Sequence, residues 1–204
     1  MDWLGIVQRL KAISQTGRHF AKSEYDLQRF DEIEEIAAEI AANHTTLGKD
    51  EIVTLFQEDS GYATPKSDCR GAIFENDKIL LVREVADGKW TLPGGWCDVG
   101  MTPTENVIRE VWEETGYEVR VERLLAVWDR DKQGHRPPYP YNIYKFFFLC
   151  EIIGGKATVS NETSEITFFG EDEIPELSRS RVVEHEIKQL FEYHRNPQMQ
   201  THCD

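Results

Sequence analysis

The chain has 204 residues, of which 40% are hydrophobic and 29% charged, and its formal net charge at pH 7 is −14. This length suits one large domain, or one domain with a small appendage. The longest apolar runs, Leu124–Trp128 and Phe146–Cys150, are far shorter than the roughly 20 residues that cross a bilayer, and residues 1–4 do not resemble a signal peptide. We therefore predict a cytoplasmic protein without a membrane partner.

The negative charge argues against non-specific binding to duplex nucleic acid, because an acidic chain repels phosphate backbones. A small polyanionic substrate remains compatible with this charge if a divalent cation joins acidic side chains to the phosphates. The four cysteines form no CxxC pair, which favours reduced thiols over a zinc site or a disulfide framework.

The first part of the sequence predicts a small all-α domain over residues 1–62. Apolar residues recur at helical spacing in Trp3–Phe20, Leu27–His44 and Asp50–Gln57. The residues expected to face the core are Leu4, Ile6, Val7, Leu10 and Ile13, then Phe30, Ile33, Ile36, Ala37 and Ile40. Three short helices make a marginal core, so we expect them to pack on the rest of the chain or on a partner subunit.

Residues 66–204 follow a mixed pattern after the turn-forming segment Gly61–Lys66. The expected strands are Cys69–Phe74, Lys78–Val82, Val119–Trp128, Tyr141–Ile152 and Glu165–Phe169, and an Asn76-Asp77 turn joins the first two. The expected helices are Thr102–Thr115 and Arg181–His194, the second with an apolar face of Val182, Val183, Ile187, Leu190 and Phe191. This order predicts an α+β fold with a mostly β core flanked by helices.

The helix Thr102–Thr115 has clear start and stop signals. Thr102 and Glu105 can form a capping box around Pro103, and Gly116 suits the left-handed residue that ends a helix. At about 100° per residue, one side of this helix should face the core. That side carries Val107, Ile108, Val111 and Trp112.

Three glutamates, Glu110, Glu113 and Glu114, share a separate arc of the same helix. Like charges so close together repel one another, and a hard cation with oxygen ligands would remove that repulsion. The alternative is a solvated acidic face balanced by Arg109. The preceding Pro93-Gly94-Gly95 turn favours the metal site, because glycines allow close backbone approach and leave a carbonyl, such as that of Gly94, free as a ligand.

The segment from Gly95 to Tyr117 resembles the motif of the Nudix hydrolases, G-x5-E-x7-R-E-U-x-E-E-x-G-U with U bulky and apolar. The matching residues are Gly95, Arg109, Glu110, Val111, Glu113, Glu114, Gly116 and Tyr117. One position departs from the motif, since Met101 stands where the family has its first glutamate. The departure predicts weaker catalysis than is usual in the family unless another acid, for which we expect Glu105, reaches Arg109.

The whole chain resembles a Gram-positive subgroup of CDP-choline or ADP-ribose pyrophosphatases that carry an N-terminal helical domain. The segments that support this are Pro93–Gly100, Asn161–Glu165 and Leu177-Ser178. The resemblance implies an α/β/α sandwich around a mixed β-sheet over residues 66–204, and a homodimer. It also implies hydrolysis of CDP-choline to CMP and phosphocholine, or of ADP-ribose to AMP and ribose 5-phosphate.

By the same resemblance, Glu110, Glu113, Glu114 and Gly94 would hold Mg²⁺, with Mn²⁺ as a possible substitute, and Arg109 would orient the glutamates. Water would attack one phosphorus, and the other phosphate would leave. A loop carboxylate often serves as the base in the family. Glu162 and Glu165 are the candidates here, although either could be a plain surface acid.

Substrate selection is expected in Asp129–Tyr144. Aromatic side chains there could stack on a base, and basic ones could meet phosphate. These residues are Tyr139, Tyr141, Tyr144, Arg130, Lys132, His135 and Arg136. The basic strip keeps open a secondary hypothesis of an RNA-directed hydrolase, either a 3′–5′ exonuclease or a cap-removing enzyme, and Met101 keeps open that of a catalytically weak nucleotide sensor.

Overall fold

A computed structural model describes residues 3–57, 60–139 and 141–204. The chain forms two compact units. The first is Met1–Pro65 with Pro138–Asn142, and the second is Lys66–Pro137 with Ile143–Asp204. Part of Asp129–Tyr144, the segment expected to select the substrate, therefore belongs to the N-terminal unit. There the backbone oxygen of Tyr139 accepts a hydrogen bond from Gln8 Nε2 at 3.2 Å.

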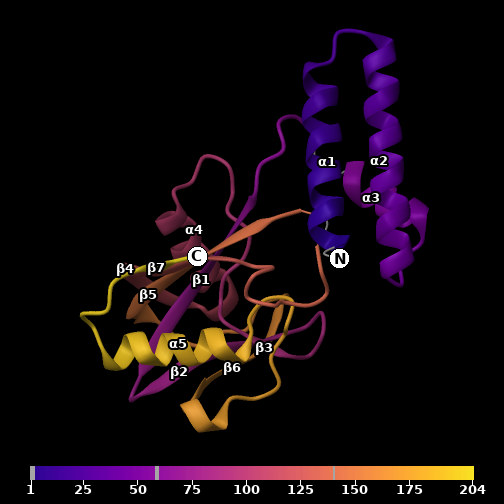
Figure 1. The fold of residues 1–204 in the computed structure, drawn as a ribbon. Coiled ribbons are helices and arrows are strands. Elements are labelled where there is room, and N and C mark those ends of the chain that lie inside the picture. The colour runs from indigo at the N-terminus through magenta and orange to yellow at the C-terminus, as the bar shows by residue number, and fades with distance from the viewer. Residues whose placement is uncertain (1–2, 58–59, 140) are drawn as a thin grey trace. The chain divides into compact units, whose positions relative to one another are not determined.

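The N-terminal unit contains three helices, as expected: α1 (Trp3–Phe20), α2 (Glu24–His44) and α3 (Lys49–Gln57) (Figure 1). The fully buried apolar residues are Val7, Ala37, Ala38, Ala41, Ile52 and Phe56. The predicted apolar stripes were partly wrong, since Ile13 and Ile36 are 51% and 45% exposed. Small alanine side chains fill the contact instead, because α1 and α2 pack closely along their length.

The second unit is built on a mixed sheet with the strand order β3-β2-β1-β5-β4-β7, and β6 pairs with β2. The strands are β1 (Lys66–Glu75), β2 (Lys78–Glu84), β3 (Trp90–Thr91), β4 (Tyr117–Asp129), β5 (Ile143–Gly155), β6 (Thr163–Phe169) and β7 (His202–Cys203). Strands β1 and β5 run parallel, whereas β2 and β4 pair antiparallel to them. The Asn76-Asp77 turn joins β1 to β2, as predicted.

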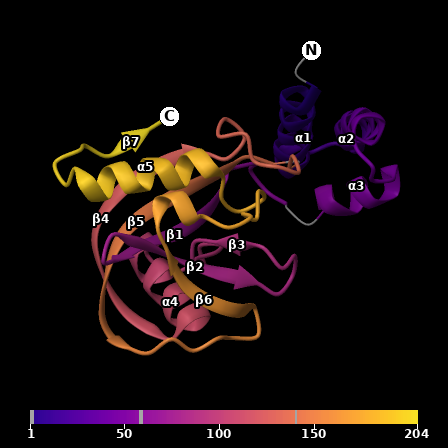
Figure 2. The same ribbon diagram turned by 90° about the horizontal axis from the view of Figure 1, so that it is seen from below.

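Helices cover both faces of this sheet, so the predicted α/β/α sandwich is confirmed (Figure 2). Neighbouring residues of one strand point to opposite faces. In β2, Leu80 packs in the cluster under α4 (Pro103–Thr115) and Leu81 in the cluster under α5 (Glu184–Arg195). The apolar face predicted for the C-terminal segment is buried throughout. A short 3₁₀ helix, η1 (Glu171–Glu173), precedes α5.

Helix α4 begins and ends as its sequence predicts. Thr102 and Glu105 form the capping box, and Gly116 ends the helix in the left-handed conformation at φ 71°. Val107 and Val111 are fully buried, but Trp112 is 57% exposed, so its assignment to the core was wrong. The buried side is therefore narrower than the apolar residues suggested, and the arc with the glutamates takes part in the contact.

Among the helices of the described residues, none combines the length and apolar character that a membrane crossing requires.

Candidate active site

The turn Pro93-Gly94-Gly95 is fastened to strand β1. Gly71 N donates to the Pro93 carbonyl at 2.9 Å, and Cys69 N donates to the Gly95 carbonyl at 2.8 Å. Gly94 has φ 134°, and a Cβ at this position would lie 2.1 Å from the carbonyl oxygen of Cys69. The turn therefore needs glycine there, and the carbonyls on both sides of Gly94 are used by β1.

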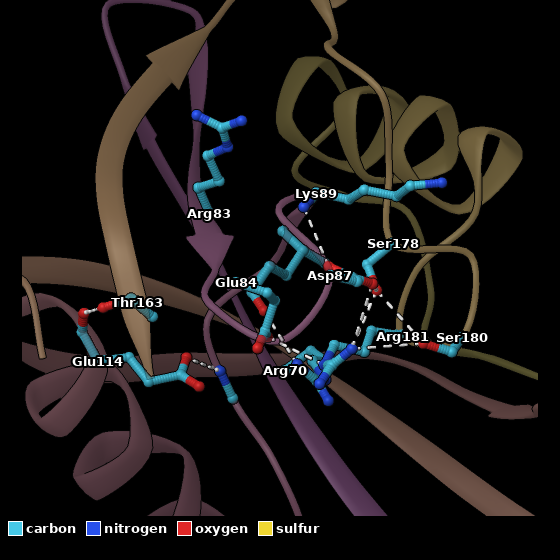
Figure 3. A network of polar contacts seen from close by, with 12 residues as sticks. Arg70, Arg83, Glu84, Asp87, Lys89, Glu114, Thr163, Ser178, Ser180 and Arg181 are labelled. Carbon is cyan, nitrogen blue, oxygen red and sulfur yellow. Dashed lines mark hydrogen bonds and ion pairs between the residues drawn. The ribbon is translucent and has the colours of Figure 1, made fainter. Parts of the chain in front are cut away.

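Two of the three motif glutamates face this turn. Glu114 Oε2 accepts a hydrogen bond from Gly94 N at 2.8 Å (Figure 3). A Cβ on Gly95 would lie 2.7 Å from Glu110 Oε2, so the absence of a side chain at Gly95 is what admits the Glu110 carboxylate. Glu113 lies apart with a half-exposed side chain, 3.9 Å from Arg109 Nε.

Burial acts strongly on both carboxyl groups at the turn. Glu114 is only 5% exposed, and loss of hydration raises its pKa to about 8, against the lowering effects of Arg70 and of the Gly94 N–H. Burial also raises the pKa of Glu110, although Arg109 opposes the shift. Paired acids with raised pKa values at a glycine turn mark a candidate functional site.

Arg70 is a buried cation of this region, and sequence reasoning missed it. Its guanidinium donates to Asp68 at 2.7 and 3.1 Å and to the Leu92 carbonyl at 3.1 Å. Lys145 also contacts Asp68 at 2.5 Å. Burial by itself would lower the pKa of Arg70, but the Asp68 charge more than offsets this and Arg70 stays charged. An arginine inside the otherwise apolar segment Cys69–Phe74 was the available signal.

These residues fit a hard divalent cation. Carboxylate oxygens are its preferred ligands, and a cation would remove the cost of ionising two neighbouring acids, of which Glu114 is buried and Glu110 partly buried. Within residues 3–57, 60–139 and 141–204, no three His, Cys, Asp or Glu side chains are already arranged to hold a metal. The candidate donors are thus the Glu110 and Glu114 carboxylates and the Gly94 carbonyl, with Glu113 outside this group.

Arg109 does not contact the acid that we expected. Glu105 is used in the helix cap, where it accepts from Thr102 N and Thr102 Oγ1, both at 2.8 Å. Arg109 donates instead to Asp98 at 2.5 Å and to Glu110 at 2.9 Å. Asp98 lies between the glycine turn and the helix, and sequence reasoning overlooked it because the motif has no acid at that position.

The two candidate bases lie in different surroundings. Glu162 precedes Thr163, whose hydroxyl donates to the Glu114 carbonyl at 2.7 Å, and its charge acts on the buried Glu84. Glu165 is exposed and forms an ion pair with Arg83 at 2.6 Å. Figure 3 shows the Arg83 side chain pointing away from Glu84 and Glu114. The contact of the neighbouring Thr163 and the effect of the Glu162 charge on Glu84 favour Glu162 over Glu165 as the candidate near the site.

A second polar group, also missed by sequence reasoning, adjoins the site (Figure 3). Glu84 at the end of β2 is buried, which raises its pKa, and it pairs with Arg181 Nε at 3.0 Å. Arg181 Nη1 donates to Ser178 Oγ at 3.1 Å, and Ser178 Oγ donates to Asp87 at 2.7 Å. The Glu84 charge also acts on Glu114, so the two groups are electrostatically linked.

The predicted basic strip is divided by burial. Arg130 is 2% exposed and donates to the carbonyls of Pro137 and Ser180. His135 is also 2% exposed, and its Nε2 lies 2.9 Å from Glu186 Oε1. The expectation that these two side chains meet phosphate is corrected, because both are buried, Arg130 donates to protein carbonyls and His135 Nε2 contacts Glu186. Lys132 and Arg136 are exposed.

The three tyrosines are separated as well. Tyr144 lies in β5 and is 44% exposed. Tyr139 and Tyr141 belong to the N-terminal unit, where their rings contact each other with centroids 5.5 Å apart. Base stacking by these side chains stays a prediction.

Comparison with known proteins agrees with this architecture. Residues 65–191 match the profile of the NUDIX domain, and residues 1–56 match the one described as "UDP-X-like, N-terminal oligomerisation domain". The Bacillus subtilis (strain 168) protein named "Putative ADP-ribose pyrophosphatase YjhB" is 43% identical over 202 residues, covering 99% of this chain and 97% of the relative.

Two solved structures are also similar. A UDP-X diphosphatase is 34% identical with a TM-score of 0.65, covering 100% of this chain and 98% of the other. An ADP-ribose pyrophosphatase from Streptococcus suis 89-1591 is 39% identical with a TM-score of 0.63, covering 69% of this chain and 100% of the other. The glycine turn, the acidic helix and these matches together place this chain in the Nudix hydrolase family.

Proposed function

We propose that this Nudix hydrolase is a Mg²⁺-dependent pyrophosphatase that cleaves the diphosphate of a nucleoside diphosphate linked to another moiety. The observation that carries the proposal is the placement of Glu110 and Glu114 at the Gly94-Gly95 turn. A bound Mg²⁺ supplies Lewis-acid chemistry, since it neutralises the diphosphate and lowers the pKa of a water. Mn²⁺ is a reasonable substitute.

The protein groups take distinct roles in this proposal. Glu110 and Glu114 hold the cation with the Gly94 carbonyl, and Arg109 fixes the Glu110 carboxylate through its 2.9 Å contact. Glu162 is the candidate that accepts a proton from the attacking water, because it lies next to the Glu114–Thr163 contact. Each guanidinium nitrogen of Arg70 already donates to Asp68 or to the Leu92 carbonyl. Arg70 therefore stabilises the acids by its charge rather than by touching substrate.

ADP-ribose is the substrate that we rank first, since it appears in the names of the B. subtilis and S. suis relatives. A UDP-linked compound follows, because the UDP-X diphosphatase shares the full length of this chain. CDP-choline stands behind both. The RNA hypothesis loses much of its support with the burial of Arg130 and His135.

A substrate panel tests the proposal. Purified protein is incubated with Mg²⁺ or Mn²⁺ and, separately, ADP-ribose, UDP-linked sugars, CDP-choline and a labelled capped RNA, with EDTA as the metal-free control. We expect nucleoside monophosphate release from one of the small substrates, and a loss of at least about 100-fold in Glu114→Gln. Turnover of RNA alone, or full activity in EDTA, would overturn the proposal.

We further propose that the chain is a homo-oligomer and most simply a homodimer. The support is the match of residues 1–56 to an N-terminal oligomerisation domain. Light scattering after size-exclusion chromatography should give twice the 23.6 kDa mass of the chain. A monomeric mass at micromolar concentration would contradict this.

A further inference from the structure

We infer that Asp98 is a positioning residue of the proposed site, which holds Arg109 and through it fixes the Glu110 carboxylate. The inference rests on the proposed metal-dependent function and adds to it a residue that lies outside the acidic helix. It also gives Arg109 an acidic partner on the loop, although Met101 stands where the family motif has its first glutamate.

The Arg109 side chain connects the loop to the helix. Arg109 Nη1 donates to Asp98 Oδ2 at 2.5 Å, and Nη2 donates to Glu110 Oε1 at 2.9 Å. The third donor, Nε, is buried without a hydrogen-bond partner among the described residues, with Glu113 Oε2 3.9 Å away. The plane of the guanidinium is therefore set by two carboxylates, one on the loop and one at the metal site.

Asp98 is itself held in place by the helix. Its backbone N–H donates to Asn106 Oδ1 at 2.8 Å. Asn106 is fully buried, and its Nδ2 donates to the Thr102 carbonyl at 3.0 Å. Asn106 and Arg109 are three residues apart and so lie on the same side of α4. The loop acid is thus attached to the helix at a point next to the arginine that it contacts.

Asp98, rather than Glu105, is the acid that holds Arg109. Among the described residues, the Glu105 carboxylate accepts its hydrogen bonds from Thr102 N and Thr102 Oγ1. A long arginine side chain has many rotamers, and a planar fork held at both ends retains one of them. Without Asp98, the Arg109 side chain would keep its hydrogen bond to Glu110 and the longer 3.9 Å ion pair with Glu113, both on its own helix. The Glu110 carboxylate would then lose a partner that is fixed from outside the helix. Outer partners of this kind commonly change metal affinity 10–100-fold when removed.

The experiment compares Asp98→Asn with Glu105→Gln in the full-length protein. Both replace an acid by its amide at the junction of loop and helix, but only the first removes a partner of Arg109. Mn²⁺ binding to the substrate-free protein is measured by electron paramagnetic resonance, and thermal unfolding checks the fold. The Asp98 side chain is 58% exposed, so Asp98→Asn should fold. We expect about ten-fold weaker Mn²⁺ binding in Asp98→Asn and a change within about two-fold in Glu105→Gln.

A double-mutant cycle separates positioning from a general structural role. Asp98→Asn should have no further effect on Mn²⁺ binding in an Arg109→Gln background, because both changes remove the same linkage. Asp98→Glu keeps the charge and should bind Mn²⁺ more tightly than Asp98→Asn. Equal binding by wild type and Asp98→Asn, additive effects in the cycle, or no recovery in Asp98→Glu would overturn the inference while leaving the proposed function intact. Absence of Mn²⁺ binding in the wild type would overturn both.

Discussion

At the scale of the residue, Glu114 is placed between opposing demands. Its burial favours the neutral acid, whereas holding a cation requires the carboxylate. The Arg70 charge and the Gly94 N–H favour the carboxylate without fully cancelling the burial. Glu114 is therefore close to the balance between its two protonation states near neutral pH, and metal binding there should release a proton.

This balance predicts how the stability of the metal-free protein depends on pH. The folded-state pKa of Glu114, about 8, lies above its unfolded value of 4.5, so the folded state retains a proton that the unfolded state has lost. The free energy of unfolding should fall as pH rises from about 4.5 to about 8, by up to roughly 5 kcal/mol from this residue. Urea unfolding in EDTA at several pH values measures it.

Glu114→Gln should markedly reduce this pH dependence, because glutamine does not ionise but can keep the hydrogen bond from Gly94. A smaller dependence should remain from Glu84 and Glu110, whose pKa values are also raised by burial. The matched control is the exposed Glu118→Gln, which should leave the slope unchanged. A wild-type slope that survives in Glu114→Gln would show that another group causes it.

The two candidate bases also make a prediction at this scale. Glu162→Gln should lower kcat by about 10²–10⁴-fold if Glu162 accepts the proton, with little change in KM. Glu165→Gln removes only an exposed ion pair with Arg83 and should retain near-wild-type kcat. Steady-state kinetics on the best small substrate decides between them, and a larger loss in Glu165→Gln would reverse the assignment.

At the scale of the element, the site depends on how closely α4 approaches the glycine turn. The capping box and Gly116 fix where the helix begins and ends, and the apolar Val107 and Val111 fix the side that faces β1. Together they set the rotation of the helix, so that Glu110 and Glu114 meet the turn and Glu113 stays at the edge. Acids within one turn of α4 therefore differ in exposure, since Glu114 is buried and Glu113 is half-exposed.

Gly95→Ala tests this approach directly. The new Cβ would lie 2.7 Å from Glu110 Oε2, so the carboxylate or the turn must move. We expect at least about ten-fold weaker Mg²⁺ activation of the hydrolysis, since displaced metal ligands lose affinity. Gly48→Ala is the control, because its Cβ would meet only Glu51 Oε2 at 3.4 Å. Unchanged Mg²⁺ dependence in Gly95→Ala would show that Glu110 is not a ligand.

At the scale of the whole molecule, the structure consists of two units with separate cores. The chain passes between them at Pro65–Lys66 and again on both sides of Pro138–Asn142. The segment Asp129–Tyr144, in which we expect substrate selection, is therefore divided between the units. Lys132 lies in the second unit and Tyr139 in the N-terminal unit. This connectivity gives a reason to test substrate binding and oligomeric state on the full chain.

Metal binding should be visible in the stability of the full chain. A ligand that binds only the folded protein stabilises it by about 2.7 kcal/mol at a concentration 100 times its Kd. Mg²⁺ should therefore raise the Tm of the wild type in a concentration-dependent way, and raise it far less in a Glu110→Gln, Glu114→Gln double variant. Differential scanning calorimetry in Ca²⁺-free buffer, with and without Mg²⁺, measures the shift in Tm. Equal shifts in the wild type and the double variant would place the cation elsewhere.

The sequence by itself determined most of the helices and strands and the position of the candidate site along the chain. The caps of α4, the apolar face of α5, the Asn76-Asp77 turn and the spacing from Gly95 to Gly116 are local patterns, and each acts through residues a few positions apart. Such short-range rules can be read without knowing what packs against them. They predicted a mostly β core flanked by helices and a group of three glutamates, of which Glu110 and Glu114 lie at the turn and Glu113 does not. The sandwich arrangement was implied by the resemblance to the Nudix hydrolases.

Only the tertiary structure decided which polar groups are joined across the chain. Arg70 and Glu84 come to the site from strands, Arg181 from the segment before α5, and Asp98 replaces Glu105 as the partner of Arg109. Burial of Arg130 and His135 likewise depends on segments about 50 residues away. Charge, burial and pKa at these positions are set by contacts between distant segments, and such contacts leave no periodic pattern in a single sequence.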